Sequence, residues 1–205
     1  NRRMKVFGIG YHRTGTTTLN ECLKRLGFAH KGYDLELLRA WQRGDLGRIR
    51  AAADRHSCFD DWPWPLVFRE LDEWYPDAKF VLTVRESPEK WLASVKRHAR
   101  TTGPTESRTI IYGDPRPDGS EEVYLEQYRT HNRAVREHFG DRPEKLLEVC
   151  WETGSGWEDL GRFLDMEVPD EPLPHANKST TWQRWTMAHK RWKRLAREAL
   201  GLRRG

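Results

Sequence analysis

At 205 residues, with 37% hydrophobic and 33% charged residues and ten tryptophans, the chain is predicted to form one globular domain over 1–205, and a disordered protein is excluded. The net charge is +5, but seven basic residues and one acid fall within 189–205, so the rest of the chain is nearly neutral. Because a nucleic-acid reader usually carries a broad basic face, we expect a small anion, and no nucleic acid, as the main ligand.

Short apolar runs alternate with helical spacings along the first part of the chain. A strand is predicted at 5–10, where an apolar, β-branched run ends in glycine, and a Thr-rich loop leads into a helix that ends at Gly27. Two short helices, separated at Gly44, are expected within 34–53. The segment 57–61 predicts a second strand that runs into an Asp-Asp-Trp-Pro loop.

Helical and strand signals continue to alternate after that loop. A helix is expected at 66–75 and a buried strand at 79–84, which delivers Arg85 at its end. A Ser-Pro pair begins a helix over 87–98, and 99–120, rich in Thr, Gly, Pro and charge, predicts a loop. The remaining predicted elements are a helix, a strand, a short helix and a basic helix, at 121–138, 145–150, 157–164 and 179–205. This order predicts an α/β fold of three layers, with a central parallel sheet and helices on both faces.

The segment 10–17, Gly-Tyr-His-Arg-Thr-Gly-Thr-Thr, lies between the first strand and its helix and has the glycine spacing of a nucleotide-phosphate loop. Unpaired amides at a helix N-terminus attract anions, and the glycines let the backbone approach the ligand. A nucleoside-triphosphatase carries Lys after the second glycine, whereas this chain has Thr16. The segment therefore predicts a loop for phosphate-like groups, and a merely glycine-rich turn is the alternative.

A carboxylate that could organise magnesium is missing after the strand at 79–84, which ends in Arg85. Glu152, after the strand at 145–150, is the comparable acid and stays open as a metal organiser. We expect no metal site. An ATP-dependent phosphotransferase on the same fold is the first alternative function, and a non-catalytic nucleotide- or RNA-binding module, favoured by the basic tail, is the second.

Three segments carry a resemblance to a known family. The pattern Gly-x-x-Arg-Thr-Gly-Thr-Thr-x-Leu at 10–19 resembles the 5'-phosphosulfate loop of sulfotransferases, with Arg13 on the basic position. The run 75–85, followed by Pro88 and Ser94, is similar to the family's second motif, in which Arg and Ser hold the 3'-phosphate. Pro-His-x-Asn at 174–177 resembles a C-terminal stretch in a bacterial and eukaryotic branch.

The resemblance implies a P-loop fold and a cofactor, 3'-phosphoadenosine 5'-phosphosulfate, that leaves as adenosine 3',5'-bisphosphate. The sulfuryl group would pass to a hydroxyl or amine of a small-molecule acceptor that the sequence does not identify. Arg85 and Ser94 are nine residues apart, one more than the family usually has, and a salt bridge at a strand end is the alternative role of Arg85. The implied cofactor-binding residues are His12, Arg13, Thr14, Gly15, Thr16, Thr17, Arg85 and Ser94.

Sulfuryl transfer benefits from a base that takes the acceptor's proton. Related enzymes contribute an acid near the acceptor from an Asp-x-Pro element, which here points to Asp61, so Arg13 and Asp61 are the expected catalytic residues. Asp60 is an alternative base, and either acid could instead cap the turn. His12 and His98 either face the site or lie on the surface. The aromatic residues that would line an acceptor pocket, or else pack in the core, are Trp62, Trp64 and Tyr112.

The expected environment is cytoplasmic. The three cysteines are widely separated, lack the paired spacing of metal ligands and are odd in number, which favours a reducing compartment. No run of about 18 apolar residues is present to span a membrane, and the first residues lack the apolar core of a signal peptide. The basic helix at 179–205 is expected to be a solvated amphipathic helix, or else to cover the nucleotide, an acidic partner or a membrane surface.

Overall fold

The structure is a computed structural model that describes residues 4–174. The basic helix expected at 179–205, and the His and Asn of the motif at 174–177, lie outside the described residues. The chain divides into a unit over 1–174 and a second unit over 175–205, and everything below concerns the first.

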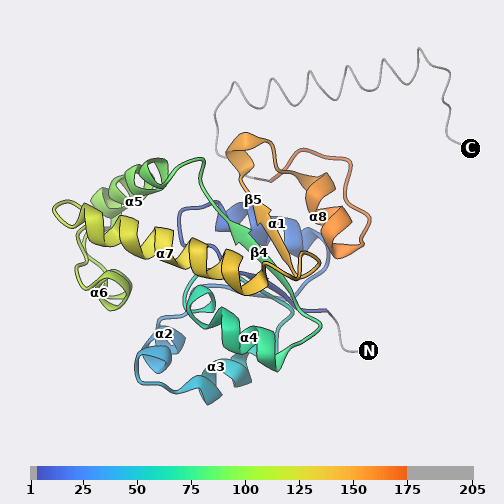
Figure 1. The fold of residues 1–205 in the computed structure, drawn as a ribbon, viewed down its shortest axis with the longest axis horizontal. Helices are drawn as coiled ribbons and strands as arrows, with labels where there is room; N and C mark the ends of the chain where they lie inside the picture. Colours follow the sequence, from blue (N-terminus) through green and yellow to red (C-terminus); the bar gives the residue numbers. More distant parts are fainter. Residues whose placement is uncertain (1–3, 175–205) are drawn as a thin grey trace, which may run out of the picture. The chain divides into compact units, whose positions relative to one another are not determined.

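A parallel sheet forms the centre of the described residues (Figure 1). Its order is β2-β3-β1-β4-β5, so the first strand occupies the middle and β5 an edge. Val6 pairs with Cys58 on one side and with Lys79 on the other. The strands span β1 Val6–Gly8, β2 His30–Lys31, β3 Cys58–Phe59, β4 Lys79–Thr83 and β5 Leu146–Val149. Because all pairs are parallel, the carboxyl ends of the strands meet at one edge, where ligands bind in such sheets.

Helices cover both faces of this sheet. α1 and α8 pack on one face through a cluster that includes Leu19, Leu23 and Leu160, while α2, α3, α4 and α7 cover the other. The helices span α1 Thr16–Arg25, α2 Leu35–Gln42, α3 Leu46–Ala53, α4 Phe68–Trp74, α5 Pro88–Thr102, α6 Glu106–Tyr112, α7 Glu121–Phe139 and α8 Trp157–Leu164, with the 3₁₀ turns η1 Trp64–Val67 and η2 Trp151–Thr153. The three-layer α/β fold predicted from the sequence is confirmed.

An aromatic cluster fixes α5, α6 and α7 at the carboxyl edge of the sheet. The rings of Trp91 on α5 and Tyr128 on α7 stack with centroids 4.3 Å apart. Tyr112 on α6 stacks on Tyr124 of α7 at 3.8 Å. Ser87 caps α5 as predicted, because its hydroxyl accepts a hydrogen bond from the Lys90 amide. The two stacked pairs hold α5 and α6 against α7.

The loop expected at 99–120 is the prediction that the structure corrects. α5 continues to Thr102, and α6 occupies 106–112. A buried guanidinium, that of Arg108, joins the two helices by donating hydrogen bonds to the hydroxyls of Thr102 and Thr105 and to the carbonyl of Gly103. These hydrogen bonds hold α6 in place, and the spacing of apolar residues, on which the sequence prediction depended, does not reveal them.

A buried ion cluster connects α4 with the far end of α7 and the start of β5. The carboxylate of Asp72 is 8% exposed and binds Lys145, and it also accepts hydrogen bonds from His138 and Arg142 at 2.9 and 2.8 Å. Burial alone would raise the pKa of Asp72, but the three hydrogen bonds outweigh it and lower that pKa. None of these residues belongs to the loop at 10–17, and the cluster joins α4 to the end of α7 and the start of β5.

Candidate active site

The loop between β1 and α1 is held against β4 by close contacts with Thr83. A Cβ on Gly10 would lie 2.1 Å from the hydroxyl oxygen of Thr83, so this position requires glycine. Thr14 is 1% exposed, and its hydroxyl donates to the carbonyl of Tyr11 at 2.5 Å and lies 2.6 Å from the Thr83 hydroxyl. The side chain of Thr14 therefore shapes the loop, and its amide is the group left for an anion.

Gly15, the residue before α1, has a left-handed backbone with φ of 90°. Trp151 of η2 lies directly against it: a Cβ on Gly15 would be 2.3 Å from the indole Cδ1. The indole Nε1 of Trp151 also donates a hydrogen bond to the Gly15 carbonyl at 3.1 Å. The sequence analysis did not identify Trp151, and the sole signal for it was its place directly after the last strand.

The N-terminus of α1 has the properties of an anion site. No side chain caps it, and its first turn contains no acidic residue. The helix begins with Thr16 and Thr17, of which Thr17 is exposed. Free amides, the positive end of the helix dipole and nearby hydroxyls together favour a phosphate or sulfate group.

Arg13 extends this positive region toward α5. Its side chain is exposed, and its Nε donates to the hydroxyl of the buried Ser94 across a long 3.4 Å. Partial burial, followed by the charges of Arg85 and Arg97, lowers the pKa of Arg13. Arg97 was missed by the sequence analysis, although it lies one turn after Ser94 and so on the same helix face. The indole of Trp91, one turn before Ser94, donates to the carbonyl of His12 at 2.9 Å and ties this face to the loop.

Arg85 follows β4 and points toward the end of β5. Its Nη2 lies 2.6 Å from a carboxylate oxygen of Glu152, and the other oxygen of Glu152 accepts from the Glu86 amide at 2.9 Å. The salt bridge considered as an alternative role for Arg85 is therefore present, and it engages the acid considered as a metal organiser. The Nε of Arg85 is buried and has no hydrogen-bond partner. One donor of this guanidinium thus stays available for a ligand.

A cavity of about 400 Å³ lies beside Arg85. The hydroxyl of Tyr128, which accepts a hydrogen bond from the Arg85 amide at 3.1 Å, lines it together with Asn132 and Cys150. Its walls come from the turn after β4, from α7 and from the end of β5. This volume is within the range of small-molecule sites.

Asp61 lies in the loop after β3 with a left-handed φ of 63°. Its pKa is raised to about 6, first by burial and then by the charge of Asp60, while the amide of Trp62 and the charge of Arg13 oppose the shift. Asp60 is engaged elsewhere, since it accepts a hydrogen bond from His30 at 2.8 Å. Asp61 is therefore the acid placed near Arg13 with a pKa suited to proton transfer near neutral pH.

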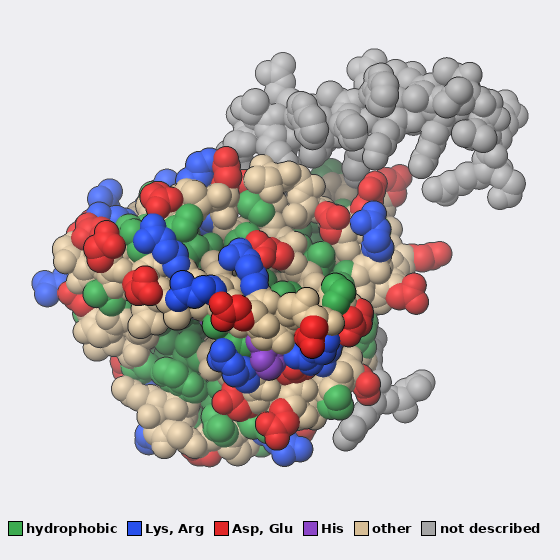
Figure 2. Space-filling model, in the orientation of Figure 1, with side chains coloured by type: hydrophobic (Ala, Val, Ile, Leu, Met, Phe, Trp, Pro, Cys, Tyr) green, Lys and Arg blue, Asp and Glu red, His purple; other side chains and the backbone are tan. Residues whose placement is uncertain are grey.

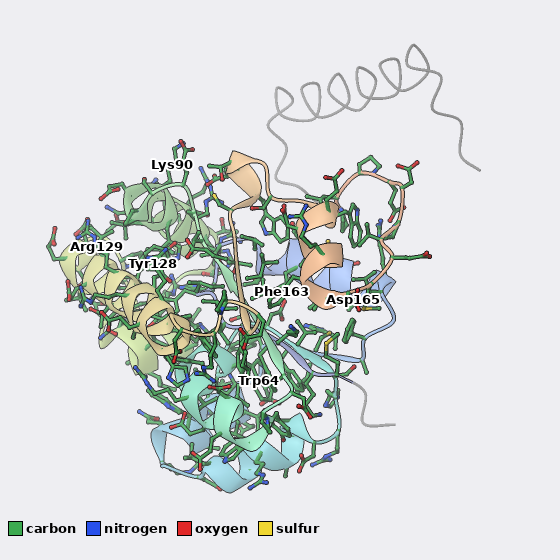
Figure 3. All side chains as sticks on the ribbon, turned by 45° about the vertical axis from the view of Figure 1, so that its right-hand side comes forward. Trp64, Lys90, Tyr128, Arg129, Phe163 and Asp165 are labelled. Atoms are coloured by element: carbon green, nitrogen blue, oxygen red, sulfur yellow. The ribbon has the colours of Figure 1, made fainter. Side chains whose placement is uncertain are left out.

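His12 connects the phosphate loop to the aromatic residues. Its Nε2 lies 2.9 Å from the hydroxyl of Tyr112, and its ring centroid is 5.5 Å from that of Trp62. Burial, followed by the charges of His98 and Arg108, lowers the pKa of His12 to about 3, so the ring is neutral at pH 7. His12, Trp62 and Tyr112 are thus brought together. Trp64, the third aromatic candidate, is fully buried and packs in the core (Figure 3).

Within residues 4–174, no group of three or more His, Cys, Asp or Glu side chains is placed to hold a metal ion. In the same part of the chain, no helix is both long and apolar enough to cross a membrane. Basic and acidic side chains are interspersed on the face shown in Figure 2.

Comparisons with known proteins match most of this chain. The model of the sulfotransferase domain matches residues 5–118 and 108–182. The chain is also similar to Ava biosynthesis cluster protein M from Aspergillus versicolor, with 28% identity over 239 residues that cover 89% of this chain and 87% of that protein. The matched segments include the loop after β1, the loop after β3, and the end of β4 with α5. This chain belongs to the sulfotransferase family.

Proposed function

We propose that the protein transfers a sulfuryl group from 3'-phosphoadenosine 5'-phosphosulfate to a hydroxyl or amine of a small-molecule acceptor. The observation that carries this proposal is the proximity of a cation and an acid, Arg13 in the loop after β1 and Asp61 in the loop after β3. Arg13 extends the anion-binding N-terminus of α1, and the charge of Arg13 acts on Asp61, whose pKa is raised to about 6. A cation for the leaving phosphate and a base for the acceptor are thus available together.

The donor set fits the cofactor, which when bound supplies a sulfuryl group activated by a phosphate leaving group. The amides of α1, with Arg13, Thr16 and Thr17, would hold the 5'-phosphosulfate. Arg85 and Ser94 would hold the 3'-phosphate, supported by the unpartnered Nε of Arg85 and by the cavity beside it. His12, Thr14 and Gly15 would contribute through the backbone of the loop.

Asp61 would take the proton of the acceptor hydroxyl or amine while that oxygen or nitrogen forms its bond to sulfur. The bound cofactor would supply the sulfuryl group, with its 5'-phosphate as the leaving group. Arg13 and the amides of α1 would stabilise the negative charge that remains on the phosphate. Fixed donors and positioning then supply most of the catalysis.

We also propose that residues 1–205 form one sulfotransferase domain, with 179–205 as its basic C-terminal segment. The family match supports this proposal because it extends to residue 182, beyond the described residues.

The proposed cofactor is tested by thermal denaturation with nucleotides. Adenosine 3',5'-bisphosphate at about 100 times its Kd is expected to raise Tm by on the order of 5–10 °C, and ADP or AMP by less, because the latter two lack the 3'-phosphate. Arg85→Ala is expected to remove this selectivity. Arg129→Ala is the matched control, since Arg129 lines the same cavity but pairs with Glu89 on the surface.

Equal Tm shifts for all three nucleotides would contradict the proposed cofactor. A larger shift with ADP and magnesium than with adenosine 3',5'-bisphosphate would instead favour a phosphotransferase. Binding of the bisphosphate without sulfuryl transfer to any acceptor would favour a nucleotide-binding module.

A further inference from the structure

Arg108 on α6 is a buried cation whose contacts are all with neutral groups. It is 4% exposed, and its Nε and Nη2 donate to the hydroxyls of Thr105 and Thr102, each at 3.0 Å, and Nη2 also donates to the carbonyl of Gly103. The Nη1 atom is buried without a hydrogen-bond partner. Within residues 4–174 no carboxylate pairs with Arg108, and Glu106 on the same helix binds Arg39.

An arrangement of this kind costs free energy in the absence of a counter-charge. Removing a guanidinium from water is expensive, and hydrogen bonds to hydroxyls and a carbonyl offset only part of that cost. Most buried cations in proteins are paired with an acid for this reason. An anionic ligand would supply the counter-charge that the described residues do not give Arg108.

Arg108 lies beside the residues that surround the reacting groups. Tyr112 is four residues further along α6, so both side chains are on one face of that helix. The hydroxyl of Tyr112 is 2.9 Å from the ring of His12, and His12 contacts Trp62, the residue after Asp61. Arg108 thus lies on the helix face whose Tyr112 contacts His12, and His12 contacts the residue that follows Asp61.

The charges of Arg13 and Arg108 act on the same two histidines. Both charges lower the pKa of His98 after burial has done so, and both also lower the pKa of His12. Arg13 and Arg108 therefore lie within electrostatic range of the same two imidazole rings. If Arg85 and Arg13 hold the cofactor, Arg108 is available for the acceptor.

We propose that the acceptor carries a carboxylate and that Arg108 binds it, with the acceptor's hydroxyl or amine directed to Asp61. This inference rests on the proposed function, because it takes the sulfuryl group to be held at Arg13. A carboxylate matches a guanidinium better than other groups do, since its two oxygens accept the parallel donors of the fork. Arg108 is then the residue that selects acceptors by charge.

The experiment compares acceptors that differ only in that charge. Matched pairs, each a free carboxylate and its methyl ester, would carry a phenol, an aliphatic hydroxyl or an amine, and sulfuryl transfer from radiolabelled cofactor would be measured for each. Wild type is expected to prefer the acid of at least one pair by about tenfold or more in kcat/KM, the worth of one hydrogen bond to a charged group. Arg108→Gln is expected to bring that ratio close to one, and Arg108→Lys to keep part of it.

Arg100→Gln is the matched control, since Arg100 is an exposed cation on α5 whose partner Asp118 is 3.9 Å away. It should leave the ratio unchanged. A purely structural role of Arg108 at the connection between α5 and α6 would lower transfer to acid and ester equally, which would contradict the proposal. If wild type transfers the sulfuryl group to the esters as well as to the acids, that result alone overturns the proposal.

Binding separates this inference from the proposed function. With adenosine 3',5'-bisphosphate bound, the acids are expected to raise Tm further and the esters less. If the bisphosphate raises Tm but no acid raises it further and no acid is sulfated, the proposed carboxylate of the acceptor is wrong. The proposed cofactor is then unaffected. If the bisphosphate itself does not bind, the proposed function fails, and the inference fails with it.

Discussion

Arg13 and Asp61 share an uncommon backbone conformation. Both have φ near +60°, and among the residues that the structure describes the other non-glycine residue with positive φ is Asp165. This conformation costs a residue with a side chain on the order of 1 kcal/mol, and Asp tolerates it better than Arg does. At Arg13 the cost is offset by the contacts of its neighbours, such as the hydrogen bond from Trp91 to His12. The two expected catalytic side chains are thus aimed by the backbone that carries them.

The raised pKa of Asp61 predicts a pH dependence of transfer. Because Asp61 must be ionised to take a proton, the rate of wild type should fall as the pH falls through about 6. Asp61→Asn keeps the shape but cannot accept a proton, so turnover should drop on the order of a hundredfold to ten-thousandfold, and the acidic limb should disappear. The pH–rate profile of both proteins, with a verified acceptor, gives the measurement.

Asp60→Asn is the control for this assignment, because Asp60 is paired with His30 and should leave the acidic limb in place. Near-normal turnover of Asp61→Asn, together with a lost limb in Asp60→Asn, would assign the base to Asp60. Cofactor affinity should hold in both variants.

At the scale of elements, the sequence predicted those with a strong local signal. The break at Gly44, the cap at Ser87 and the short helix at 157–164 all appear as expected, because glycine, the Ser-Pro pair and apolar spacing act locally. β2 has two residues and no apolar run, and its pairing with β3 depends on contacts distant in the sequence. α6 is held by Arg108, whose role the spacing of apolar residues does not reveal.

The same distinction applies to the site. The anion loop and Asp61 were predicted because motifs within the chain mark them, and their roles stay predictions. Trp151 was missed, since it reaches the loop by folding from a distant element. Ser94 was expected beside Arg85, but its hydrogen bond is with Arg13. The direction of the Arg85 side chain depends on the neighbouring strand, because Glu152, in the turn after β5, binds its guanidinium.

The ion cluster on α4 predicts a loss of stability on Asp72→Asn. The neutral side chain leaves Lys145 buried without a charge partner, so the free energy of unfolding at pH 7 should fall by about 2 kcal/mol and Tm by on the order of 5 °C. Chemical and thermal unfolding give these values. Because the pKa of Asp72 is lowered in the folded state, its stabilisation is present above about pH 4 and is lost as the pH falls through that lowered pKa.

Asp141→Asn is the control, since the side chain of Asp141 is 89% exposed and lies 3.6 Å from Arg142. It should change Tm by less than a degree or so. A loss in Asp141→Asn equal to that in Asp72→Asn would show that burial of the cluster contributes little.

At the scale of the whole described unit, the contact between Trp151 and Gly15 joins the edge of the sheet to its centre. β5 has a neighbouring strand on one side only, and such an edge opens more easily than a central strand does. Trp151 is the second residue after β5, so opening of this edge would pull the indole away from the loop that leads into α1. A ligand that orders the loop should therefore keep β5 closed.

Hydrogen exchange makes that connection visible. Adenosine 3',5'-bisphosphate is expected to slow the exchange of the β5 amides as well as those of α1, although the ligand's phosphates would lie over β1. Trp151→Phe removes the hydrogen bond to Gly15 and should leave α1 protected while β5 exchanges as in the free protein. Equal protection of β5 in both proteins would show that the edge strand does not sense the loop. Through this indole, part of the binding free energy would stabilise β5. The rate of amide exchange at this edge would then report how much of the protein has ligand bound.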